Sequence, residues 1–267
     1  MSDASLPPEG AILVMAHPDD EALWASALLS RTARVVLVFE DIDSFPAWAE
    51  GRRRSLAELP LPDVTSLRFR EAEVLNGAAW PTPAETPYGL AVRPRPGTFR
   101  GFSARRYQEA FPNLVSALRP LLTGAPAVVT HNPWGEYGHE DHVQVFRAVE
   151  SLRQELGFPL WVTSYVSDKS YPFMLRHLAR LDCSAPELPT DPKLGARLRD
   201  IYMRHGCWTW FDDYVWPPAE RFLRWLEPGE PPRPLPPGRL LPFVWIAWTP
   251  PKPLLRRLAG RAARLIR

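Results

Sequence analysis

Cysteine is scarce in this chain, and its scarcity excludes two kinds of architecture. The 267 residues contain two cysteines, Cys183 and Cys207. Two thiols cannot build a disulfide framework or a four-cysteine zinc site, so both are expected to be free in a reducing compartment. The N-terminal segment also lacks the basic region and the long apolar run of a signal peptide. The sequence therefore predicts a cytoplasmic protein.

An excess of charge of one sign and long hydrophobic runs are also lacking. The net charge of +2 is too small to indicate a nucleic-acid partner, and none is expected. The first apolar run, residues 11–16, is too short to span a membrane. With 45% hydrophobic and 23% charged residues, the composition is typical of a globular protein, and the length suits one sizeable α/β domain.

Two apolar runs flanking a helical pattern predict a βαβ unit. Residues 11–16 and 35–39 are continuously apolar, which is typical of strands buried on both faces of a parallel sheet. Between them, Pro18 and the acids that follow it predict the start of a helix, whose apolar face continues to Leu28. Such a unit favours a parallel sheet with right-handed crossovers.

Helices and strands are expected along the rest of the chain. The predicted helices cover about residues 47–58, 103–122, 139–156, 175–181 and 193–204, the predicted strands cover 67–69, 127–130, 160–163 and 243–248, and 81–101 is predicted to be a loop. The expected fold is a single α/β domain over 1–267, with a Rossmann-like, open, mostly parallel sheet and helices on both faces. Its parts are an α/β core at about 10–165, a C-terminal extension of helices and strand segments capping the site at 166–251, and a basic tail at 252–267.

The first candidate site follows the first predicted strand, where residues 16–21 read Ala-His-Pro-Asp-Asp-Glu. His17 and Asp20 are three residues apart across a strand-to-helix turn, so both side chains can converge on one ion. Asp19 lies between them and could act as a base. The same acids are also typical of an ordinary helix start, where they complement the helix dipole. Taken alone, the segment favours that structural interpretation.

The second candidate site is a histidine pair, His139 and His142, after a glycine-containing loop. Histidines at this spacing share one face of a helix. Three nitrogen or oxygen ligands and an open position form the catalytic zinc pattern, which His17, Asp20 and one of the pair would supply. Ligands bind at the carboxyl ends of parallel strands, so both motifs face one crevice if the first strand neighbours the strand ending at His131.

The two motifs together resemble those of the PIG-L/LmbE-like deacetylase family. They are residues 16–21 and residues 131–142, the latter reading His-Asn-Pro-Trp-Gly-Glu-Tyr-Gly-His-Glu-Asp-His, and the resemblance covers about residues 10–165. It implies a Rossmann-like fold, a metal that is usually zinc, and hydrolysis of an N-acetyl group by metal-activated water. The implied substrate contains an amino sugar, most often an N-acetylglucosaminyl unit, in a metabolite, glycan precursor or glycolipid.

The resemblance also implies roles for individual residues. His17, Asp20 and His142 match the metal ligands of the family. Asp19 matches the general base that activates the water, and His139 matches the residue that stabilises the oxyanion and protonates the leaving amine.

Further residues complete the expected site. Asp141 would orient a histidine by hydrogen bonding. Candidates for substrate contact are Glu21, His131, Asn132 and Asp212. Zinc is favoured by the ligand types, although histidine and carboxylate also suit other divalent metals such as iron, cobalt or nickel.

One departure from the family leaves other functions open. Sugar-deacetylating relatives commonly carry a Thr-Asp-Gly-like turn after the second strand, where this chain reads Glu-Asp-Ile-Asp at 40–43. The alternatives are the same chemistry on a non-sugar acylated amide or natural product, and a catalytically silent member that binds metal or a partner. A dinucleotide-binding oxidoreductase is excluded because no G-x-G-x-x-G follows the first strand.

Two C-terminal segments lie outside the resemblance. Residues 208–216 are dense in aromatics, which form ligand platforms or ordinary core, and the core interpretation is slightly favoured. Residues 252–267 hold six basic residues and no acid. Such a segment can lie on an anionic membrane surface, but it more often docks on its own domain or frays, so peripheral membrane contact is the second interpretation. The sequence predicts no oligomeric state.

Overall fold

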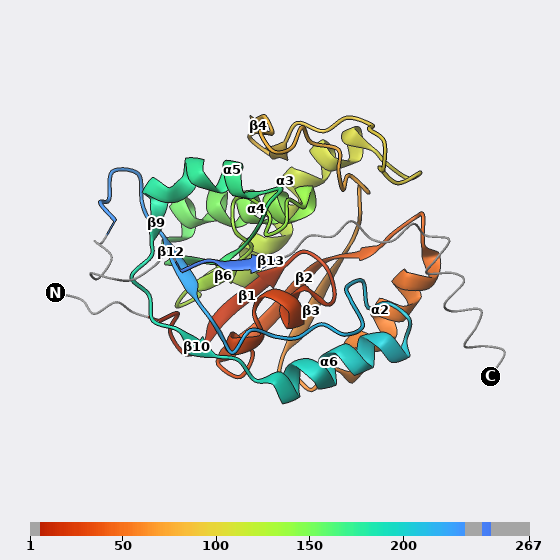
Figure 1. Cartoon of the computed structure of the whole chain (residues 1–267), viewed down its shortest axis with the longest axis horizontal. Helices are drawn as coiled ribbons and strands as arrows, with labels where there is room; N and C mark the ends of the chain where they lie inside the picture. The colour runs from red at the N-terminus through yellow and green to blue at the C-terminus, as the bar shows by residue number, and fades with distance from the viewer. Residues whose placement is uncertain (1–5, 233–241, 247–267) are drawn as a thin grey trace.

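A seven-stranded sheet forms the centre of the molecule, as a computed structural model shows for residues 6–232 and 242–246 (Figure 1). Its strand order is β3-β2-β1-β6-β7-β12-β9. The strands are β1 (Ala11–Met15), β2 (Thr32–Asp41), β3 (Val64–Arg70), β6 (Val128–Thr130), β7 (Leu160–Thr163), β9 (Leu181–Asp182) and β12 (Phe222–Trp225). The first five strands in this order, β3, β2, β1, β6 and β7, pair in parallel, and β12 pairs antiparallel with both β7 and β9. The predicted open, mostly parallel α/β sheet is confirmed.

The strand order reverses between β1 and β6. The chain places β2 and β3 on one side of β1, and β6 and β7 on the other. In the β1–β6 ladder, Val14 is the partner of Thr130, so both strands end at the same edge of the sheet. Ligands of open parallel sheets bind at such a switch in strand order. The two strands that precede the motifs are therefore neighbours, as the shared crevice requires.

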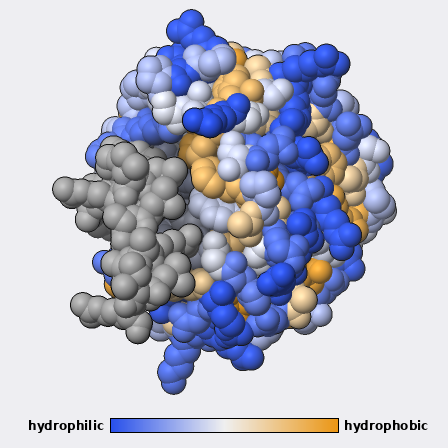
Figure 2. Space-filling view, turned by 90° about the vertical axis from the view of Figure 1, so that its right-hand side faces the viewer, coloured by the Kyte–Doolittle hydropathy of each residue, from blue (hydrophilic) through white to orange (hydrophobic). Residues whose placement is uncertain are grey.

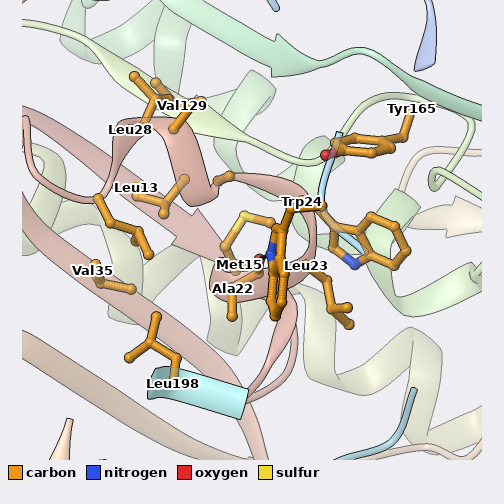
Figure 3. Close-up of a cluster of buried hydrophobic side chains, with 14 of the residues drawn as sticks. Leu13, Met15, Ala22, Leu23, Trp24, Leu28, Val35, Val129, Tyr165 and Leu198 are labelled. Carbon is orange, nitrogen blue, oxygen red and sulfur yellow. Dashed lines mark hydrogen bonds between the residues drawn. The ribbon is translucent and has the colours of Figure 1, made fainter. Parts of the chain in front are cut away.

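Helices cover both faces of this sheet, as predicted. The helices α3 (Ala104–Leu122) and α4 (Glu140–Leu156) lie on one face, and α1 (Asp20–Trp24), α2 (Pro46–Glu58) and α6 (Pro192–Arg204) lie on the other (Figure 1). Successive side chains of a strand point to opposite faces. Accordingly, Leu13 and Met15 of β1 pack in the cluster that contains Leu198 of α6 (Figure 3). Val14 packs in the opposite cluster with Leu118 of α3.

The core on the α3 side predicts a clear stability difference between two leucines. Leu118 is fully buried, whereas Leu175 is 44% exposed. Leu118→Ala is expected to lower the free energy of unfolding by about 2–5 kcal/mol, because it removes buried methyl groups and leaves a cavity. Leu175→Ala, the matched control, should change it by less than about 0.5 kcal/mol. Urea denaturation measures both, and equal losses would contradict the packing described.

The helix after β1 differs from the prediction. A continuous helix to Leu28 was expected, but α1 ends at Trp24 and a separate 3-10 turn, η1, covers Ser26–Leu28. The Glu220 carboxylate accepts hydrogen bonds from the Ser26 hydroxyl (3.0 Å) and the Ala27 amide (2.9 Å). The Ala27 amide therefore bonds to a residue that is distant in the sequence instead of to a carbonyl of the preceding helical turn. The helix ends at Trp24, and the prediction of one helix was wrong.

Other predicted elements change in smaller ways. The helix predicted from about 139 begins at Glu140, with His139 as its N-cap. The predicted loop 81–101 contains a short hairpin of β4 (Glu85–Thr86) and β5 (Gly89–Leu90). Where a helix over 175–181 was expected, α5 (Tyr171–Met174) leads into the 3-10 helix η2 (Leu175–Arg180). The remaining strands are β8 (Tyr165–Ser167), β10 (Leu188–Pro189), β11 (Ala219–Glu220) and β13 (Val244–Ile246).

The region after residue 165 extends the sheet as well as packing on the α1 side. It supplies the strands β12 and β9, so the predicted 10–165 core holds five of the seven strands. It also supplies α6, which contacts α1 and α2. The strand predicted at 243–248 appears as β13, and its last two residues lie outside the described residues, as does the whole basic tail 252–267. Membrane contact through that tail stays a prediction.

The helices, the surface and the cysteines of the described residues can be compared with what the composition predicted. None of the helices within residues 6–232 and 242–246 has the length and apolar character needed to cross a bilayer. On the face seen in Figure 2, hydrophilic side chains predominate, with smaller hydrophobic areas between them. Cys183 and Cys207 are both buried and free, as predicted.

Candidate metal centre

The loops after β1 and β6 meet and are joined by hydrogen bonds. The amide of Ala16, at the end of β1, donates to Nε2 of His131, which follows β6 (2.8 Å). The carbonyl of Ala16 accepts from the amides of Val38 and Phe39 in β2 (3.2 and 2.7 Å). The start of the first motif is therefore held by hydrogen bonds on both sides, to His131 and to β2. Its side chains lie at the same edge of the sheet as those of the second motif, residues 131–142.

His17, Asp20 and His142, the three predicted ligands, lie together and are buried. Oδ2 of Asp20 lies 3.2 Å from Nδ1 of His17 and 3.3 Å from Nε2 of His142. The Asp20 carboxylate is fixed by its own loop, because Oδ2 accepts the His17 amide (2.7 Å) and Oδ1 accepts the indole N–H of Trp24 (2.9 Å). Trp24 is a fully buried core residue, so the hydrophobic core sets the orientation of this carboxylate.

His139 completes a group of three imidazoles. Its ring lies parallel to that of His142 with centroids 4.5 Å apart, and 4.8 Å from the His17 ring. As the N-cap of α4, it accepts the amide N–H of Asp141 on Nδ1 (3.2 Å). Burial, followed by the neighbouring His142 and His17, lowers the pKa of His139 well below its usual range. The ring is therefore neutral, and its hydrogen is on Nε2.

Gly135 allows the loop to approach His139 closely. Its φ is +66°, and a Cβ built there would lie 2.4 Å from the carbonyl oxygen of His139. Only glycine tolerates both the left-handed conformation and this contact. The His139 amide in turn donates to the Gly135 carbonyl (3.0 Å). The glycine of the second motif therefore sets where α4 begins and where its capping histidine lies.

Three overlapping groups of buried side chains have ligand atoms within 4.8 Å of one another. They are His17 with His139 and His142, Asp20 with His131 and His142, and His17 with Glu71 and Asp141. His17 and His142 each belong to two of the groups. Imidazole nitrogens and carboxylate oxygens in this mixture are ligand types of zinc and of other divalent transition metals.

Several of these buried atoms lack a partner, which fits a metal site. Within the described residues, Nε2 of His17, Nε2 of His142 and both carboxylate oxygens of Asp141 make no hydrogen bond. Buried polar atoms are nearly always hydrogen-bonded, and buried charges are paired or coordinate metals. A divalent cation held by one of the three groups would supply the missing partner of the atoms that it contacts, so the residues present fit such an ion.

Glu136 was not predicted, although it lies inside the second motif. Its Oε2 is 2.7 Å from Nδ1 of His142 and 3.0 Å from Nδ1 of His131, and its Oε1 accepts the hydroxyl of Thr163. Burial opposes ionisation of Glu136, but the two histidines outweigh it and lower its pKa to about 2. A carboxylate on Nδ1 leaves Nε2 of His142 as the nitrogen that faces Asp20. The orienting role expected of Asp141 is filled, for His142, by Glu136.

Asp141 and Glu71 instead lie on the far side of His17. Nε2 of His17 is 3.4 Å from Oδ2 of Asp141 and 3.9 Å from Oε1 of Glu71, which also accepts from the guanidinium of Arg52. Burial opposes the charged form of His17, but Glu71, Asp141 and Asp20 outweigh it and raise its pKa to about 10. The acids around His17 thus create a negative potential that favours a cation.

Asp19 lies beside the cluster in an unusual backbone conformation. Its φ of +106° is rare for a residue other than glycine. Its Oδ2 accepts both the amide (2.8 Å) and the hydroxyl (2.7 Å) of Thr209, a residue that was not predicted to take part. Burial and the neighbouring Asp20 carboxylate raise the pKa of Asp19 to about 7.

The four predicted substrate contacts have different surroundings. Glu21, His131 and Asn132 are fully buried and bonded within the protein: Glu21 to the hydroxyl of Tyr202 (2.7 Å), and Asn132 to that of Thr163 (3.0 Å). These bonds place the three residues as supports of the two loops. Asp212 is exposed, and no hydrogen bond or ion pair among the described residues joins it to the cluster. Their contact with substrate stays a prediction.

The aromatic segment 208–216 packs against α1. Trp208, Trp210 and Trp216 are buried. The indole N–H of Trp216 donates to the carbonyl of Ala22 (2.6 Å), and the rings of Trp210 and Trp24 meet edge to face at 5.1 Å. The favoured interpretation of this segment as core agrees with these contacts.

About half of the chain is similar in sequence to a known deacetylase. No family model matches the chain. It is 26% identical over 152 residues to a protein of Actinosynnema mirum named 1D-myo-inositol 2-acetamido-2-deoxy-alpha-D-glucopyranoside deacetylase. The matched region covers 51% of this chain and 52% of that protein. The chain thus matches about half the length of this curated relative.

One solved deacetylase structure shares the architecture of this chain, and a second is matched with a lower score. One is the crystal structure of a deacetylase–teicoplanin complex from the biosynthesis pathway of teicoplanin, with a TM-score of 0.51 and 17% identity, covering 80% of this chain and 97% of that one. Another is the zinc-inhibited form of the teicoplanin deacetylase Orf2, with a TM-score of 0.46 and 18% identity, covering 73% and 83%. The first likeness shows that this chain has the α/β fold of a known deacetylase.

Proposed function

We propose that the protein is a metal-dependent hydrolase that removes an N-acetyl group from a substrate containing an amino sugar. The observation that carries the proposal is the buried cluster of His17, Asp20 and His142, in which Oδ2 of Asp20 lies 3.2 Å from Nδ1 of His17 and 3.3 Å from Nε2 of His142. The curated relative, named a deacetylase of an acetamido sugar, supports the reaction class and the amino sugar.

The proposed ligands are His17, Asp20 and His142, and zinc is the proposed metal. Bound by three protein ligands, zinc supplies a Lewis acid and a nucleophilic water at neutral pH. The protein holds these ligands in place through other residues. Trp24 orients Asp20, and Glu136 fixes the tautomer of His142. Such partners of a ligand keep its orientation and its basicity.

Asp19 is the proposed general base. Thr209 occupies its Oδ2, while no donor among the described residues binds its Oδ1. In this proposal the free oxygen accepts the proton of the attacking water. The Asp20 carboxylate helps to raise the pKa of Asp19, which supports a place for Asp19 near the ligands. General-base catalysis of this kind contributes about 10²–10⁴-fold in rate.

His139 is the proposed electrophilic residue. Because the amide of Asp141 donates to its Nδ1, the hydrogen of the neutral ring is on Nε2. This N–H can donate to the acetyl carbonyl oxygen as negative charge develops on it. The resemblance also gave the leaving-group proton to His139, but a neutral ring would have to become an imidazolate to supply it. We therefore assign that proton to Asp19, which has taken it from the attacking water.

The charged residues after β2 do not support a sugar contact by this part of the chain. Asp43 forms ion pairs with Arg70 and Arg106 (both 3.0 Å), and its amide donates to Glu73 (2.9 Å). Arg52 is buried and donates to Glu71. These charges are engaged within the protein, so they do not themselves support the sugar part of the proposed substrate.

Acetate release tests the proposed function. The purified protein is incubated with N-acetylglucosamine, N-acetylglucosaminyl-inositol, an N-acetylglucosaminyl lipid and an N-acetylglucosaminylated glycopeptide, with and without a chelator. Acetate is expected from at least one of them, lost with the chelator and restored by zinc. Release that the chelator leaves unchanged, or release from a non-sugar acetamide alone, would refute the proposal.

Replacing Glu136 tests how the ligands are held. Glu136→Gln is expected to weaken zinc binding about 10–100-fold, because an amide holds the Nδ1 positions of His131 and His142 less strongly than a carboxylate. Glu220→Gln, at a buried carboxylate bonded to Ser26 and Tyr165, is the matched control and should bind zinc normally. Competition titration with a chromophoric chelator measures both affinities. Equal affinities in the two variants would show that Glu136 does not support a ligand.

A further inference from the structure

We propose that Thr209, from the segment that follows α6, is a positioning residue that fixes the carboxylate of Asp19. The inference rests on the proposed function, in which Asp19 is the base. Thr209 is separated from Asp19 by 190 residues in the chain and lies outside both motifs. It gives the C-terminal half of the molecule a direct part in arranging the reacting groups.

The contact is specific to one oxygen. Thr209 donates its backbone amide (2.8 Å) and its hydroxyl (2.7 Å) to the same atom, Oδ2 of Asp19. Hydrogen bonds to a carboxylate are stronger than those between neutral groups, and two of them on one oxygen restrict the orientation of the carboxylate. Oδ1, which has no hydrogen bond among the described residues, is then the oxygen that we assign to the attacking water.

The backbone of Asp19 needs such support. With φ +106° and ψ −20°, it lies in a region that residues other than glycine rarely adopt, and such conformations persist where the surroundings hold them. Its amide donates to Oε2 of Glu21 (3.1 Å), whose Oε1 accepts the hydroxyl of Tyr202 in α6 (2.7 Å). α6 and the segment after it therefore hold both the backbone and the side chain of Asp19.

Thr209 itself lies on a well-anchored stretch. The amide of Cys207 donates to the carbonyl of Tyr202 (3.0 Å), and the indole of Trp208 donates to the carbonyl of Phe211 (3.0 Å). On the other side of Thr209, Trp210 packs edge to face on Trp24. Trp24 in turn bonds Asp20, so the same packing aligns the proposed base with a proposed ligand.

The first test uses the metal-free protein and needs no substrate. Thr209→Val removes the hydroxyl but keeps the shape and the amide, and it is combined with Asp19→Ala in a double-mutant cycle of thermal unfolding. With Asp19 present, Thr209→Val is expected to lower the unfolding midpoint by about 2–4 °C. With alanine at position 19, the same change should have little effect. Equal shifts in the two backgrounds would overturn the inference.

The second test separates positioning from structure in the zinc-loaded protein, with the N-acetylated compound that is turned over fastest. Thr209→Val is expected to lower kcat about 10–100-fold, because a small displacement of a reacting group is costly, while KM stays within about twofold. Thr209→Ser, which keeps the hydroxyl, should restore most of kcat. Thr190→Val is the matched control, since Thr190 donates its hydroxyl to the Pro217 carbonyl in the same part of the molecule.

The outcomes distinguish this inference from the proposed function. If Asp19→Ala abolishes turnover but Thr209→Val does not slow it, Asp19 is the base and the positioning role is wrong. If Thr209→Ser is as slow as Thr209→Val, the hydroxyl is not the cause, and the role is again wrong. If Asp19→Ala turns over normally, the proposed base is wrong, and the inference falls with it.

Discussion

Asp19→Asn is expected to lower the rate of acetate release about 10²–10⁴-fold while the protein keeps its metal. Asparagine has nearly the shape of aspartate and tolerates a positive φ, so it suits the +106° backbone of this position. Its amide oxygen can still accept the two hydrogen bonds from Thr209. What it lacks is a carboxylate oxygen able to take a proton from water.

Turnover and bound metal must be measured on the same preparation of this variant. Asp213→Asn, at an exposed acid of the segment that contains Thr209, is the matched control and should keep the parent rate. A variant at position 19 that keeps both metal and full turnover would remove Asp19 as the base. A variant that loses its metal would show that Asp19 belongs to the ligands instead.

His17→Ala and His142→Ala are each expected to abolish stable zinc binding, with a loss in affinity of more than about 100-fold. The reason is that a missing ligand costs more than a missing partner of a ligand, which typically costs 10–100-fold. Both side chains are buried, and their Nε2 atoms have no hydrogen-bond partner among the described residues. Alanine at either position also leaves the surrounding carboxylates without a compensating group.

Metal analysis by mass spectrometry after dialysis measures this loss. His177→Ala is the matched control, because His177 is another buried histidine, lies against Phe173 and Trp225, and belongs to none of the candidate metal groups of the described residues. It should keep about one zinc per chain. Full zinc content in His142→Ala would mean that the metal is held by His17, Glu71 and Asp141, the one candidate group of the described residues that lacks His142.

The features that sequence reasoning predicted well depend on neighbours in the chain. The buried strands are visible as continuous apolar runs, such as residues 11–16, because both faces of β1 are covered. The first motif lies directly after that strand, so its place at the carboxyl edge follows from the strand. The second motif follows β6 in the same way, and the pairing of the two strands brings His17 and His142 together.

The features that were missed depend on contacts between distant parts of the chain. Thr209 meets Asp19 across 190 residues, and Glu220 interrupts the first helix at Ser26 across 194 residues. No local pattern marks either residue, since threonine and glutamate are common in ordinary loops and strands. Glu136 is a different case: it lies five residues after His131 and six before His142, so a search for a carboxylate near the ligands could have found it.

The position of His139 relative to the start of α4 determines which of its ring nitrogens carries the hydrogen. Spacing alone placed His139 on the helix, whereas its backbone is extended and its ring caps the helix. The cap uses Nδ1 and leaves the hydrogen on Nε2. A sequence pattern does not define the first residue of a helix, and here a difference of one residue determines which nitrogen can donate.

Anomalous X-ray diffraction at the zinc absorption edge, from crystals grown with zinc, tests the metal centre most directly. The expected result is one strong anomalous peak about 2.0–2.2 Å from a nitrogen of His17, an oxygen of Asp20 and a nitrogen of His142. A peak between His17, Glu71 and Asp141, or no peak at this edge of the sheet, would contradict the assignment of the ligands.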